Sequence, residues 1–503
     1  MLFFGGILYA EKVGEFSLIC SFIILKIHGR RRFAYCKSVK DLNNYTKNQI
    51  CGLPTAQELK KSVISSIDSN ARQKISQLFD EGTFVETSVY TKRNISDFLT
   101  TEKSDELEGV ITGYGAIDGK LVFAFAEDSA RMDGAIDERH AKKIVDLYKL
   151  ALNNGAPVIG IFDSCGTDIF EGTVGLAAYG RIIASVTKAS GVIPQIAFVS
   201  GKCLGTAAAI AAMFDFTVKT DKATFFIAPD KEDDALTAYV AGEEQCAAYI
   251  RRLVSYLPSN SSEGVSVGAS ADNLNRALGD VDFGGDALVA IASIADSSIY
   301  DEVYAKDGCP ISTAFTTIGG VKCGVVASSF SKNEGRIDAA AANKASKFVN
   351  FCDAFSIPVV TLVDSMGLSA SDTKGLSPAL ASLAFAYASS SVPKITVLMN
   401  HAIGASFVLL GSKALGADMV YALDDSEIGA LAAESGVAFA WDKYITLENT
   451  REKLIGEWKA SVTSPVVAAA SGEIDDIIGV TELRARICSA LLMLAGKSDF
   501  LAY

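Results

Sequence analysis

The sequence predicts an α/β protein in which one domain occurs twice. Three observations support this: residues 109–229 and 314–430 repeat one order of elements, continuous Val/Ile runs alternate with helical segments, and the intervening loops are short. Continuous apolar runs are typical of parallel strands that helices bury on both faces. A chain of 503 residues with 49% hydrophobic side chains contains enough apolar material for two such domains.

Each repeat begins with a β-hairpin. The turn residues are Asp118-Gly119 in the first copy and Gly319-Gly320 in the second, and apolar runs flank both pairs. Such dipeptides allow the positive φ angles of a two-residue hairpin turn. Beyond each hairpin we expect a polar, glycine-containing loop and then a helix, at residues 138–153 and 339–355.

Two buried strands follow in each repeat. The first strand ends in Asp-Ser, at Asp163 and at Asp364, which lie 201 positions apart (364 minus 163). The second strand begins at Pro194 and at Pro393, which lie 199 positions apart (393 minus 194). Near-constant offsets over about a hundred residues indicate two copies of one unit.

Three further segments complete the expected organisation. We expect an amphipathic helix at residues 236–257, a turn-rich linker at 258–264 and a docking helix at 474–495. The predicted domains are an unmatched N-terminal extension (1–60), a first half (61–265) and a second half (266–503).

Composition excludes several functional classes. The net charge of −13 argues against nucleic acid as a partner, so an anionic ligand would need a local basic patch. The ten cysteines contain no CxxC pair, which favours reduced thiols in a cytoplasmic protein. Mean hydropathy is +0.27, yet no apolar run reaches the roughly 18 residues of a membrane-spanning helix.

The first fifty residues fit none of the common targeting segments. Their two apolar stretches, residues 2–10 and 16–27, are followed rather than preceded by the basic run Arg30-Arg31-Arg32, unlike a signal peptide. The second stretch could be an interfacial anchor. We favour an upstream extension without a fixed fold.

The chemistry is expected to depend on the backbone. The chain has three histidines and lacks a phosphate loop, a GxGxxG turn and HExxH, and no GxSxG elbow follows a predicted buried strand. Small-residue turns instead follow the buried strands, and a turn leading into a helix presents N–H groups that can hold an oxyanion. Close helix–sheet packing is the alternative explanation for these small residues.

Long segments of the sequence resemble the β-type carboxyltransferase subunits of biotin-dependent acyl-CoA carboxylases and decarboxylases. The similarity runs from about Ala71 to about Leu494, and the segments that carry it are residues 71–86, 109–115, 190–196, 253–260, 351–364 and 392–397. The resemblance implies two tandem crotonase-like spiral domains, in a subunit that usually forms hexamers in which the first half of one copy faces the second half of its partner.

The resemblance also implies the reaction, the partners and the site. The family moves a carboxyl group between N1-carboxybiotin on a separate biotin carrier protein and a short acyl-CoA such as propionyl- or acetyl-CoA. The acyl-CoA lies on the first half and biotin on the second; no metal is expected, and biotin itself takes the α-proton. The other expected partner is a biotin carboxylase or a membrane decarboxylase subunit.

Positions are carried over residue by residue. The first oxyanion hole falls on Cys165 and Gly166 and the second on Ala405 and Ser406. The residues expected to contact substrate are Gly134, Gly205, Gly367, Gly404 and Val408.

The sequence departs from the family at several of these positions. Cys165 replaces a glycine, Asp168 an arginine and Lys202 a proline, and Val408 occupies a position associated with acyl-chain selectivity. Three other functions therefore stay open: the carboxyltransferase component of a sodium-pumping methylmalonyl-, malonyl- or glutaconyl-CoA decarboxylase; a non-catalytic paralogue; and a crotonase-like hydratase, isomerase or hydrolase that uses Glu138 or Glu171 as its acid or base.

Overall fold

The computed structural model describes residues 23–27, 30–34, 57–58, 69–93, 107–228, 231–232, 237–265, 267–270, 272–279, 283–305, 309–370 and 373–497. The chain divides into two units, Met1–Ser66 and Ile67–Tyr503. In the first unit, β1 (Ile23–Ile27) and β2 (Arg30–Ala34) pair as an antiparallel hairpin. Most of the expected N-terminal extension lies outside the described residues.

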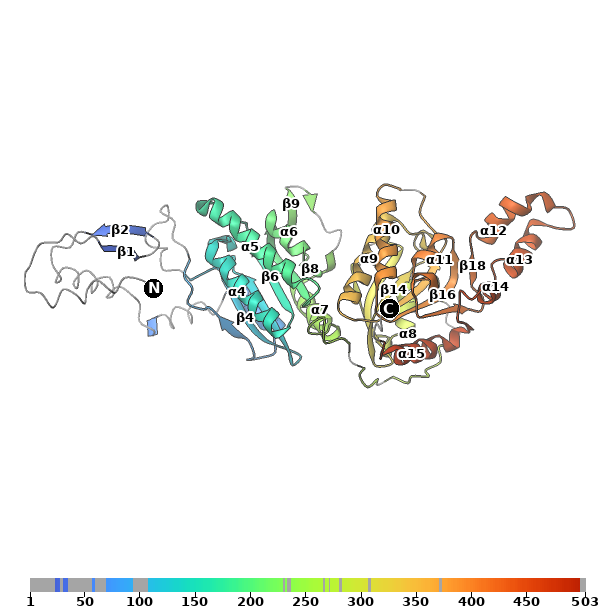
Figure 1. The fold of residues 1–503 in the computed structure, drawn as a ribbon, viewed down its shortest axis with the longest axis horizontal. Coiled ribbons are helices and arrows are strands. Elements are labelled where there is room, and N and C mark those ends of the chain that lie inside the picture. Colours follow the sequence, from blue (N-terminus) through green and yellow to red (C-terminus); the bar gives the residue numbers. More distant parts are fainter. Residues whose placement is uncertain are drawn as a thin grey trace, which may run out of the picture. The chain divides into compact units, whose positions relative to one another are not determined.

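The first half is built on a mixed sheet with the strand order β10-β9-β7-β6-β5-β4-β3; β8 joins β7 and carries β11 (Figure 1). Strands β5, β6 and β7 are parallel to one another, while β4 and β5 form the expected antiparallel hairpin. The strands are β3 (Val85–Thr87), β4 (Val110–Ile117), β5 (Lys120–Glu127), β6 (Val158–Ser164), β7 (Gln195–Leu204), β8 (Phe216–Thr220), β9 (Thr224–Ala228), β10 (Lys231–Glu232) and β11 (Thr237–Ala241).

The second half repeats this arrangement in the order β12-β13-β14-β15-β16-β17-β19, with β18 added to β16. Its hairpin is formed by β13 and β14, and its parallel core by β14, β15 and β16. The strands are β12 (Tyr300–Val303), β13 (Ile311–Ile318), β14 (Val321–Ser328), β15 (Val359–Ser365), β16 (Lys394–Ile403), β17 (Met419–Leu423), β18 (Glu427–Gly429) and β19 (Asp476–Ile478).

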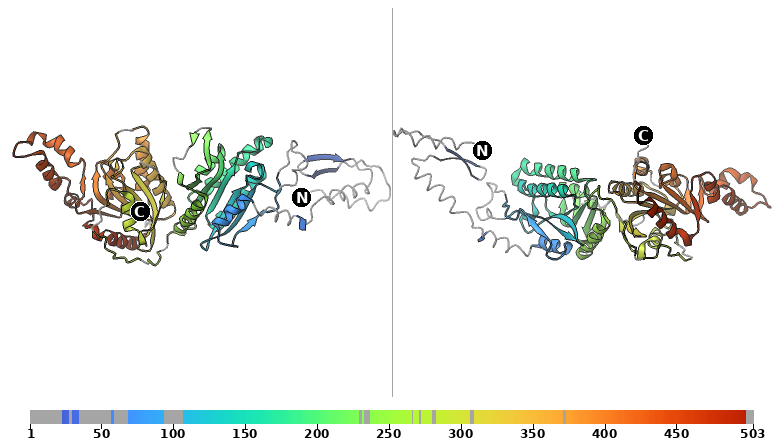
Figure 2. Two further views of the ribbon diagram at one scale, coloured as in Figure 1. Left: turned by 180° about the vertical axis from the view of Figure 1, so that it is seen from behind. Right: turned by 60° about the horizontal axis from the view of Figure 1, so that its bottom comes forward.

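Helices cover both faces of each sheet (Figures 1 and 2). Alternate residues of β5 explain why: Val122 and Ala124 join the core beneath α3 and α7, whereas Phe123 and Phe125 join the core beneath α4 and α5. The helices of the first half are α3 (Asn70–Leu78), α4 (Glu138–Asn154), α5 (Thr173–Ala189), α6 (Thr206–Ala212) and α7 (Glu243–Tyr256). Those of the second half are α8 (Ala287–Ile294), α9 (Ala339–Ala354), α10 (Leu376–Ser389), α11 (Ala405–Leu409), α12 (Ala433–Gly436), α13 (Arg451–Ser461), α14 (Pro465–Ala470) and α15 (Leu483–Leu494).

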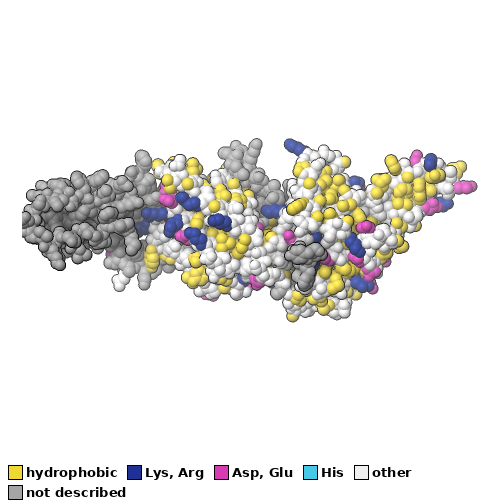
Figure 3. Space-filling model, viewed as in Figure 1, with side chains coloured by type: hydrophobic (Ala, Val, Ile, Leu, Met, Phe, Trp, Pro, Cys, Tyr) yellow, Lys and Arg dark blue, Asp and Glu magenta, His cyan; other side chains and the backbone are white. Residues whose placement is uncertain are grey.

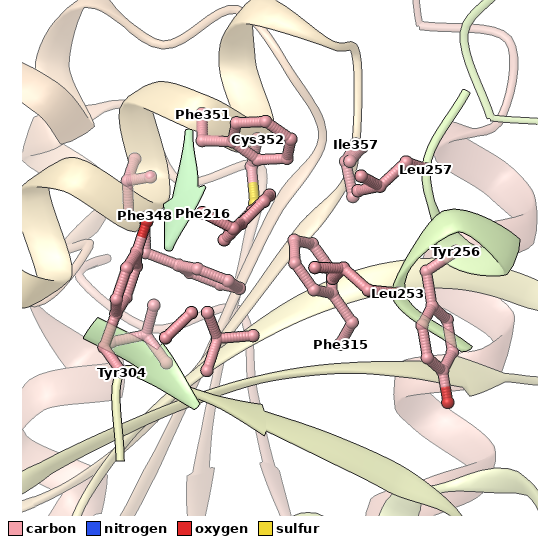
Figure 4. Close-up of a cluster of buried hydrophobic side chains, with 14 of the residues drawn as sticks. Phe216, Leu253, Tyr256, Leu257, Tyr304, Phe315, Phe348, Phe351, Cys352 and Ile357 are labelled. Carbon is pink, nitrogen blue, oxygen red and sulfur yellow. The ribbon is translucent and has the colours of Figure 1, made fainter. Parts of the chain in front are cut away.

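One buried hydrophobic cluster contains side chains from both halves. Figure 4 shows aromatic rings from both halves in contact, with the ring of Phe216 4.6 Å from that of Phe351 and 5.8 Å from that of Phe315 (centroid distances). Leu253 and Tyr256 of α7 belong to the same buried cluster. Much of the high apolar content of the chain is therefore buried where the repeats meet.

Two expected helices are shorter than the sequence patterns suggested. Residues 237–241 do not belong to the helix predicted at 236–257; they form β11, parallel to β8, and α7 begins only at Glu243. The helix predicted at 474–495 begins at Leu483, because residues 476–478 pair with β17 as β19. In both cases a strand at the edge of a sheet supplies hydrogen bonds that a local pattern cannot reveal.

Other features follow the sequence directly. Asp118 and Gly119 adopt φ angles of 49° and 77° in the first hairpin turn, and Gly319 and Gly320 adopt 59° and 81° in the second. Each described cysteine is a free thiol, and all of them except Cys165 are buried. Among the described residues, no helix is both long and apolar enough to cross a membrane.

Candidate active site

The turns expected to carry the chemistry lie side by side at the carboxyl ends of the parallel strands. In the first half, Ser164 at the end of β6 pairs with Cys203 near the end of β7. In the second half, Ser365 of β15 pairs with Ala402 of β16 in the same way. The structure therefore brings Cys165-Gly166 next to the Gly205 turn, and Met366-Gly367 next to the Gly404 turn.

The Gly205 and Gly404 turns have the same backbone conformation. Gly205 has φ 58° and ψ −123°, and Gly404 has φ 59° and ψ −129°; each residue directly precedes a helix, α6 or α11. Ala405 and Ser406 are the first two residues of α11, so their N–H groups have no acceptor within the helix. This geometry supports the second predicted hole.

The repeat places Thr206 and Ala207 in the first half where Ala405 and Ser406 stand in the second. They are the first residues of α6 and follow a glycine of matching conformation. The sequence analysis did not include them among the candidates. Applying the offset between the repeats to the second hole would have found them.

Cys165 and Gly166 are placed differently from what the sequence suggested. They do not begin a helix, because a 3₁₀ turn (Ile169–Glu171) comes first and α5 begins only at Thr173. The N–H of Cys165 donates to the carbonyl of Asp133 (2.9 Å), and the N–H of Gly166 donates to Ser164 Oγ (3.1 Å).

The second half contains the same pair of hydrogen bonds. Met366 donates to the carbonyl of Glu334 (3.0 Å) and Gly367 donates to Ser365 Oγ (3.2 Å). In both halves the two N–H groups of this turn are thus already bonded, one to a carbonyl of the preceding loop and one to the serine that ends the strand. An oxyanion at the first turn would share or replace these acceptors.

In each half, one glycine of the loop allows the end of a strand to approach that loop closely. A Cβ added at Gly134 would lie 2.3 Å from the carbonyl oxygen of Asp163, and one added at Gly335 would lie 2.2 Å from that of Asp364. Both residues also have positive φ angles, 72° and 66°. No other residue type fits either position without moving the strand end.

The aspartates that end the first strands fix the neighbouring turns. Asp163 accepts the Lys202 N–H (3.1 Å) and the Ser129 hydroxyl (2.8 Å). It also accepts from the buried Lys74 ammonium (3.4 Å).

Asp364 plays the same part in the second half. It accepts from Asn400 Nδ2 (3.0 Å) and contacts His401 Nδ1 (2.9 Å). His401 also stacks on Phe330, with 4.5 Å between ring centroids, and lies three residues before Gly404. The sequence analysis did not assign His401 a role in the site.

The remaining candidates are distributed on α11. Ser406 is buried, and its hydroxyl donates toward the carbonyls of Ser365 (3.1 Å) and Ile403 (2.8 Å), so it joins the two turns of the second half. Val408 is 45% exposed and available to a ligand.

Asp168 has a cationic partner from a distant segment. Arg93 Nη2 lies 3.3 Å from Asp168 Oδ2, and the two side chains are 5% and 3% exposed. Asp168 also accepts the Phe170 N–H at the start of the 3₁₀ turn. A guanidinium is therefore present beside this position, although the residue at 168 is an acid.

The Cys165 side chain is a poor nucleophile in this environment. Although the side chain is partly exposed, loss of solvent around the sulfur, and next the negative charge of Asp133, raise the pKa of its thiol above the ordinary value. Only the thiolate attacks carbonyl carbon effectively. The contribution of Cys165 is thus expected to come from its backbone.

Comparison with known proteins agrees with this geometry. The profile of the carboxyl transferase domain matches residues 68–237 and 231–503. The chain belongs to the carboxyl transferase family. The predicted family and enzyme class are confirmed: the protein is a carboxyltransferase.

Curated relatives and a solved structure extend over most of this carboxyltransferase. The chain is 34% identical over 464 residues to the methylmalonyl-CoA decarboxylase subunit alpha of Veillonella parvula (85% of this chain, 90% of the relative). It is 33% identical over 482 residues to the propionyl-CoA carboxylase beta chain of Saccharopolyspora erythraea (86% and 88%).

The solved structure is transcarboxylase 12S, described as a hexamer with methylmalonyl-coenzyme A bound. It superimposes with a TM-score of 0.81 at 30% identity and covers 93% of this chain and 98% of that one. This confirms the expected fold of two tandem crotonase-like domains.

Proposed function

We propose that this carboxyltransferase moves a carboxyl group between biotin on a separate carrier protein and a short acyl-CoA. The observation that carries the proposal is the duplicated site: each half presents a strand-end turn beside a glycine turn that begins a helix, with matching φ and ψ angles. A reaction that stabilises one oxyanion on each of two substrates requires two such sites.

The first half is suited to the thioester. Removing the α-proton of an acyl-CoA places negative charge on the thioester oxygen, and backbone N–H groups stabilise that charge without changing their own protonation. Cys165 and Gly166 supply these donors when the thioester oxygen displaces their present acceptors, the Asp133 carbonyl and Ser164 Oγ, and Gly134 and Gly205 shape the turns around them. Loss of one such donor typically costs about 100- to 1000-fold in rate.

The second half is suited to the ureido oxygen of biotin, which takes on negative charge when the carboxylate leaves. When bound there, carboxybiotin would supply the carboxyl group and, once its carboxylate has left, the base that takes the α-proton before the new carbon–carbon bond forms. Ala405 and Ser406 supply N–H donors at the start of α11, while Gly367 and Gly404 keep the adjoining backbone free of side chains. His401, held by Asp364, borders this site.

The surface supports an anionic ligand on the first half. Although the net charge is −13, Lys and Arg side chains gather over α4 and α5 (Figure 3). Lys142, Lys149 and Arg181 are exposed there; the two lysines pair with Asp146 and the arginine with Glu138, so a phosphate would compete with these carboxylates. Such a patch favours the phosphates of coenzyme A.

Exposed apolar side chains support assembly into a homo-oligomer, as in the hexameric relative. Phe439, Leu447 and Val466 of the segment around α12, α13 and α14 are 84%, 101% and 63% exposed, and Ile169 beside the first turn is 77% exposed. Apolar patches of this kind mark interfaces. We expect a hexamer in which one copy's first half faces its partner's second half.

The other functions are less well supported. Glu171 Oε2 accepts the N–H of Glu138 at the start of α4, so this pair caps a helix rather than forming an isolated acid or base for a hydratase. A non-catalytic paralogue is supported only by the substitutions at Cys165 and Asp168, and Arg93 balances the charge of the second. Carboxylation and decarboxylation use one site, and the choice depends on the partner subunit.

The test is carboxyl transfer to free biotin. Purified enzyme is incubated with malonyl-, methylmalonyl- or glutaconyl-CoA, and both the acyl-CoA product and carboxylated biotin are followed by mass spectrometry. We expect biotin-dependent loss of the carboxyl group from at least one substrate. Stable binding of the biotin carrier without turnover of any substrate would instead support the non-catalytic paralogue.

A further inference from the structure

A cluster of buried ionisable groups lies behind the first turn. It consists of Glu108, which precedes β4, Glu127 at the end of β5, and Asp137 and His140 at the start of α4. These residues are 4%, 2%, 0% and 0% exposed. Buried charged groups are costly, so their presence calls for an explanation.

Glu127 connects the cluster to the predicted oxyanion hole. Pairing between strands β5 and β6 ends at Ala126 and Ile161. Beyond this pair, the Asp163 N–H donates to the side chain of Glu127, at Oε2 (2.9 Å). Asp163 lies two residues before Cys165. The backbone that carries the hole is therefore held by a side chain rather than by the next strand.

His140 lies between the two glutamates without a close hydrogen bond to either. Its Nδ1 is 3.5 Å from Glu108 Oε1 and its Nε2 is 3.9 Å from Glu127 Oε1. Among the described residues, neither ring nitrogen has a hydrogen-bond partner, and Glu108 Oε2 also lacks one. The Glu127 carboxyl is therefore buried beside an imidazole to which it makes no hydrogen bond.

The second half shows that the fold does not require this cluster. Ser328 replaces Glu127 and its hydroxyl accepts the Asp364 N–H (2.6 Å), while Ala341 replaces His140 at the third position after the capping aspartate. Cys309 replaces Glu108. The Asp128 N–H donates to the carbonyl of Gly109, and the Ser329 N–H donates in the same way to the carbonyl of Pro310, so the residues just before these two, Glu108 and Cys309, are equivalent. The ionisable groups therefore belong to the half assigned to the thioester.

We propose that Glu127 is a positioning residue of the first oxyanion hole, and that its buried carboxyl, which holds the Asp163 N–H, stays protonated and therefore uncharged during transfer. The Glu127 carboxyl then accepts the Asp163 N–H without adding its own negative charge beside the developing enolate. The inference rests on the proposed acyl-CoA site of the first half.

The electrostatic surroundings place this proton in the neutral pH range. Burial raises the pKa of Glu127 to about 7, against the opposing attraction of His140. Burial also raises the pKa of Asp137 to about 6. For Glu108, burial opposes ionisation, but attraction to His140 lowers the pKa of the carboxyl below its ordinary value. The other groups facing the cluster are Arg93, Lys143, Asp163, Cys165, Glu171, Tyr179 and Cys203.

The sign of the effect follows from the raised pKa. Below about pH 7 Glu127 is protonated; as the pH rises through this value the proton leaves and a buried negative charge appears behind the hole. Negative charge there opposes an enolate, so carboxyl transfer by the wild type should fall on the alkaline side.

The experiment compares Glu127→Gln with the wild type over pH 6 to 9. The glutamine keeps an oxygen acceptor for the Asp163 N–H but cannot ionise, so its transfer rate should be independent of pH where the wild-type rate falls about tenfold per pH unit. Glu127→Leu removes the acceptor and should lower transfer about 100-fold at every pH. Ser328→Ala is the matched control in the second half and should keep the alkaline fall.

Infrared difference spectra between wild type and Glu127→Gln provide a readout that needs no turnover or substrate. We expect a protonated-carboxyl band in the wild type that disappears as the pH rises through the neutral range. An alkaline fall that persists in Glu127→Gln, or a spectrum without a titrating carboxyl band, would overturn the proposal. A wild type that shows the band but transfers no carboxyl group would instead contradict the proposed function.

Discussion

Alanine at Gly134 should disturb the first site through the backbone alone. The new Cβ would lie 2.3 Å from the carbonyl oxygen of Asp163, a distance below 3.0 Å that real Cβ atoms essentially never show. Its φ of 72° adds about 1–2 kcal/mol of strain for a residue other than glycine, and overpacking adds about 1–3 kcal/mol. We therefore expect a loss of stability of about 2–5 kcal/mol and a displaced strand end.

Gly82→Ala is the matched control. Gly82 has a similar φ of 70°, but an added Cβ there meets no atom within 4 Å, so only the backbone strain of about 1–2 kcal/mol applies. Denaturant unfolding measures both variants. Carboxyl transfer by Gly134→Ala should fall about 100-fold, because a shift of about 1 Å at a reacting centre costs this much, while Gly82→Ala should retain the wild-type rate.

Gly335→Ala separates the two halves. Its Cβ would lie 2.2 Å from the carbonyl oxygen of Asp364, so transfer should fall by a similar factor while calorimetric binding of acyl-CoA stays intact. Binding of acyl-CoA should weaken only in Gly134→Ala. If Gly134→Ala transferred the carboxyl group as fast as Gly82→Ala, the reasoning from strand-end geometry would be refuted.

Three further predictions concern charged groups. Asp168→Ala leaves Arg93 buried without its partner and should cost about 3–5 kcal/mol in denaturant unfolding, whereas an unchanged midpoint would show that the pair is not buried in solution. Glu127→Gln should stabilise the fold above pH 7. Because the pKa of Glu127 is raised to about 7 in the folded protein, its contribution to the free energy of unfolding of the wild type is fully present below pH 4.5 and is lost as the pH rises to about 7, a difference of about 3 kcal/mol. Equal stabilities of the variant and the wild type at pH 8 would contradict this. His401→Ala removes one contact of Asp364 at the second turn, so the rate of carboxyl transfer to biotin should fall about tenfold while acyl-CoA binding stays unchanged. Weaker acyl-CoA binding would argue against the assignment of acyl-CoA to the first half and biotin to the second.

The repeat made much of the fold predictable from sequence. The hairpin turns at Asp118-Gly119 and Gly319-Gly320, and the strands ending at Asp163 and Asp364, occur where the patterns placed them, because turn chemistry and buried apolar runs are local signals. The strand β11 was not predictable, because its hydrogen bonds come from β8, which is distant in sequence.

The site was predictable only in part. The glycine turns at 205 and 404 could be recognised from the small residues around them, but the partner of Asp168 could not, because Arg93 lies 75 positions earlier and belongs to no motif. The Glu127–His140 contact is equally invisible in sequence. The sequence also suggested a helix directly after Cys165, whereas the structure inserts a 3₁₀ turn there.

The domain boundaries expected at residues 60 and 265 stay predictions. The described residues after 66 form one unit whose core includes side chains from both halves, such as Phe216 and Phe315. The two sheets are nevertheless separate, which is consistent with duplication of one domain followed by packing of the copies.

The central claim is that backbone N–H groups, and not a side-chain nucleophile, support carboxyl transfer. The most direct test is the rate of carboxyl transfer from methylmalonyl-CoA or malonyl-CoA to biotin by Cys165→Ala beside the wild type. The account predicts transfer by both proteins, with rates within about threefold, since the N–H at position 165 is retained. A loss of about 100-fold or more in Cys165→Ala, with its fold intact, would contradict the claim.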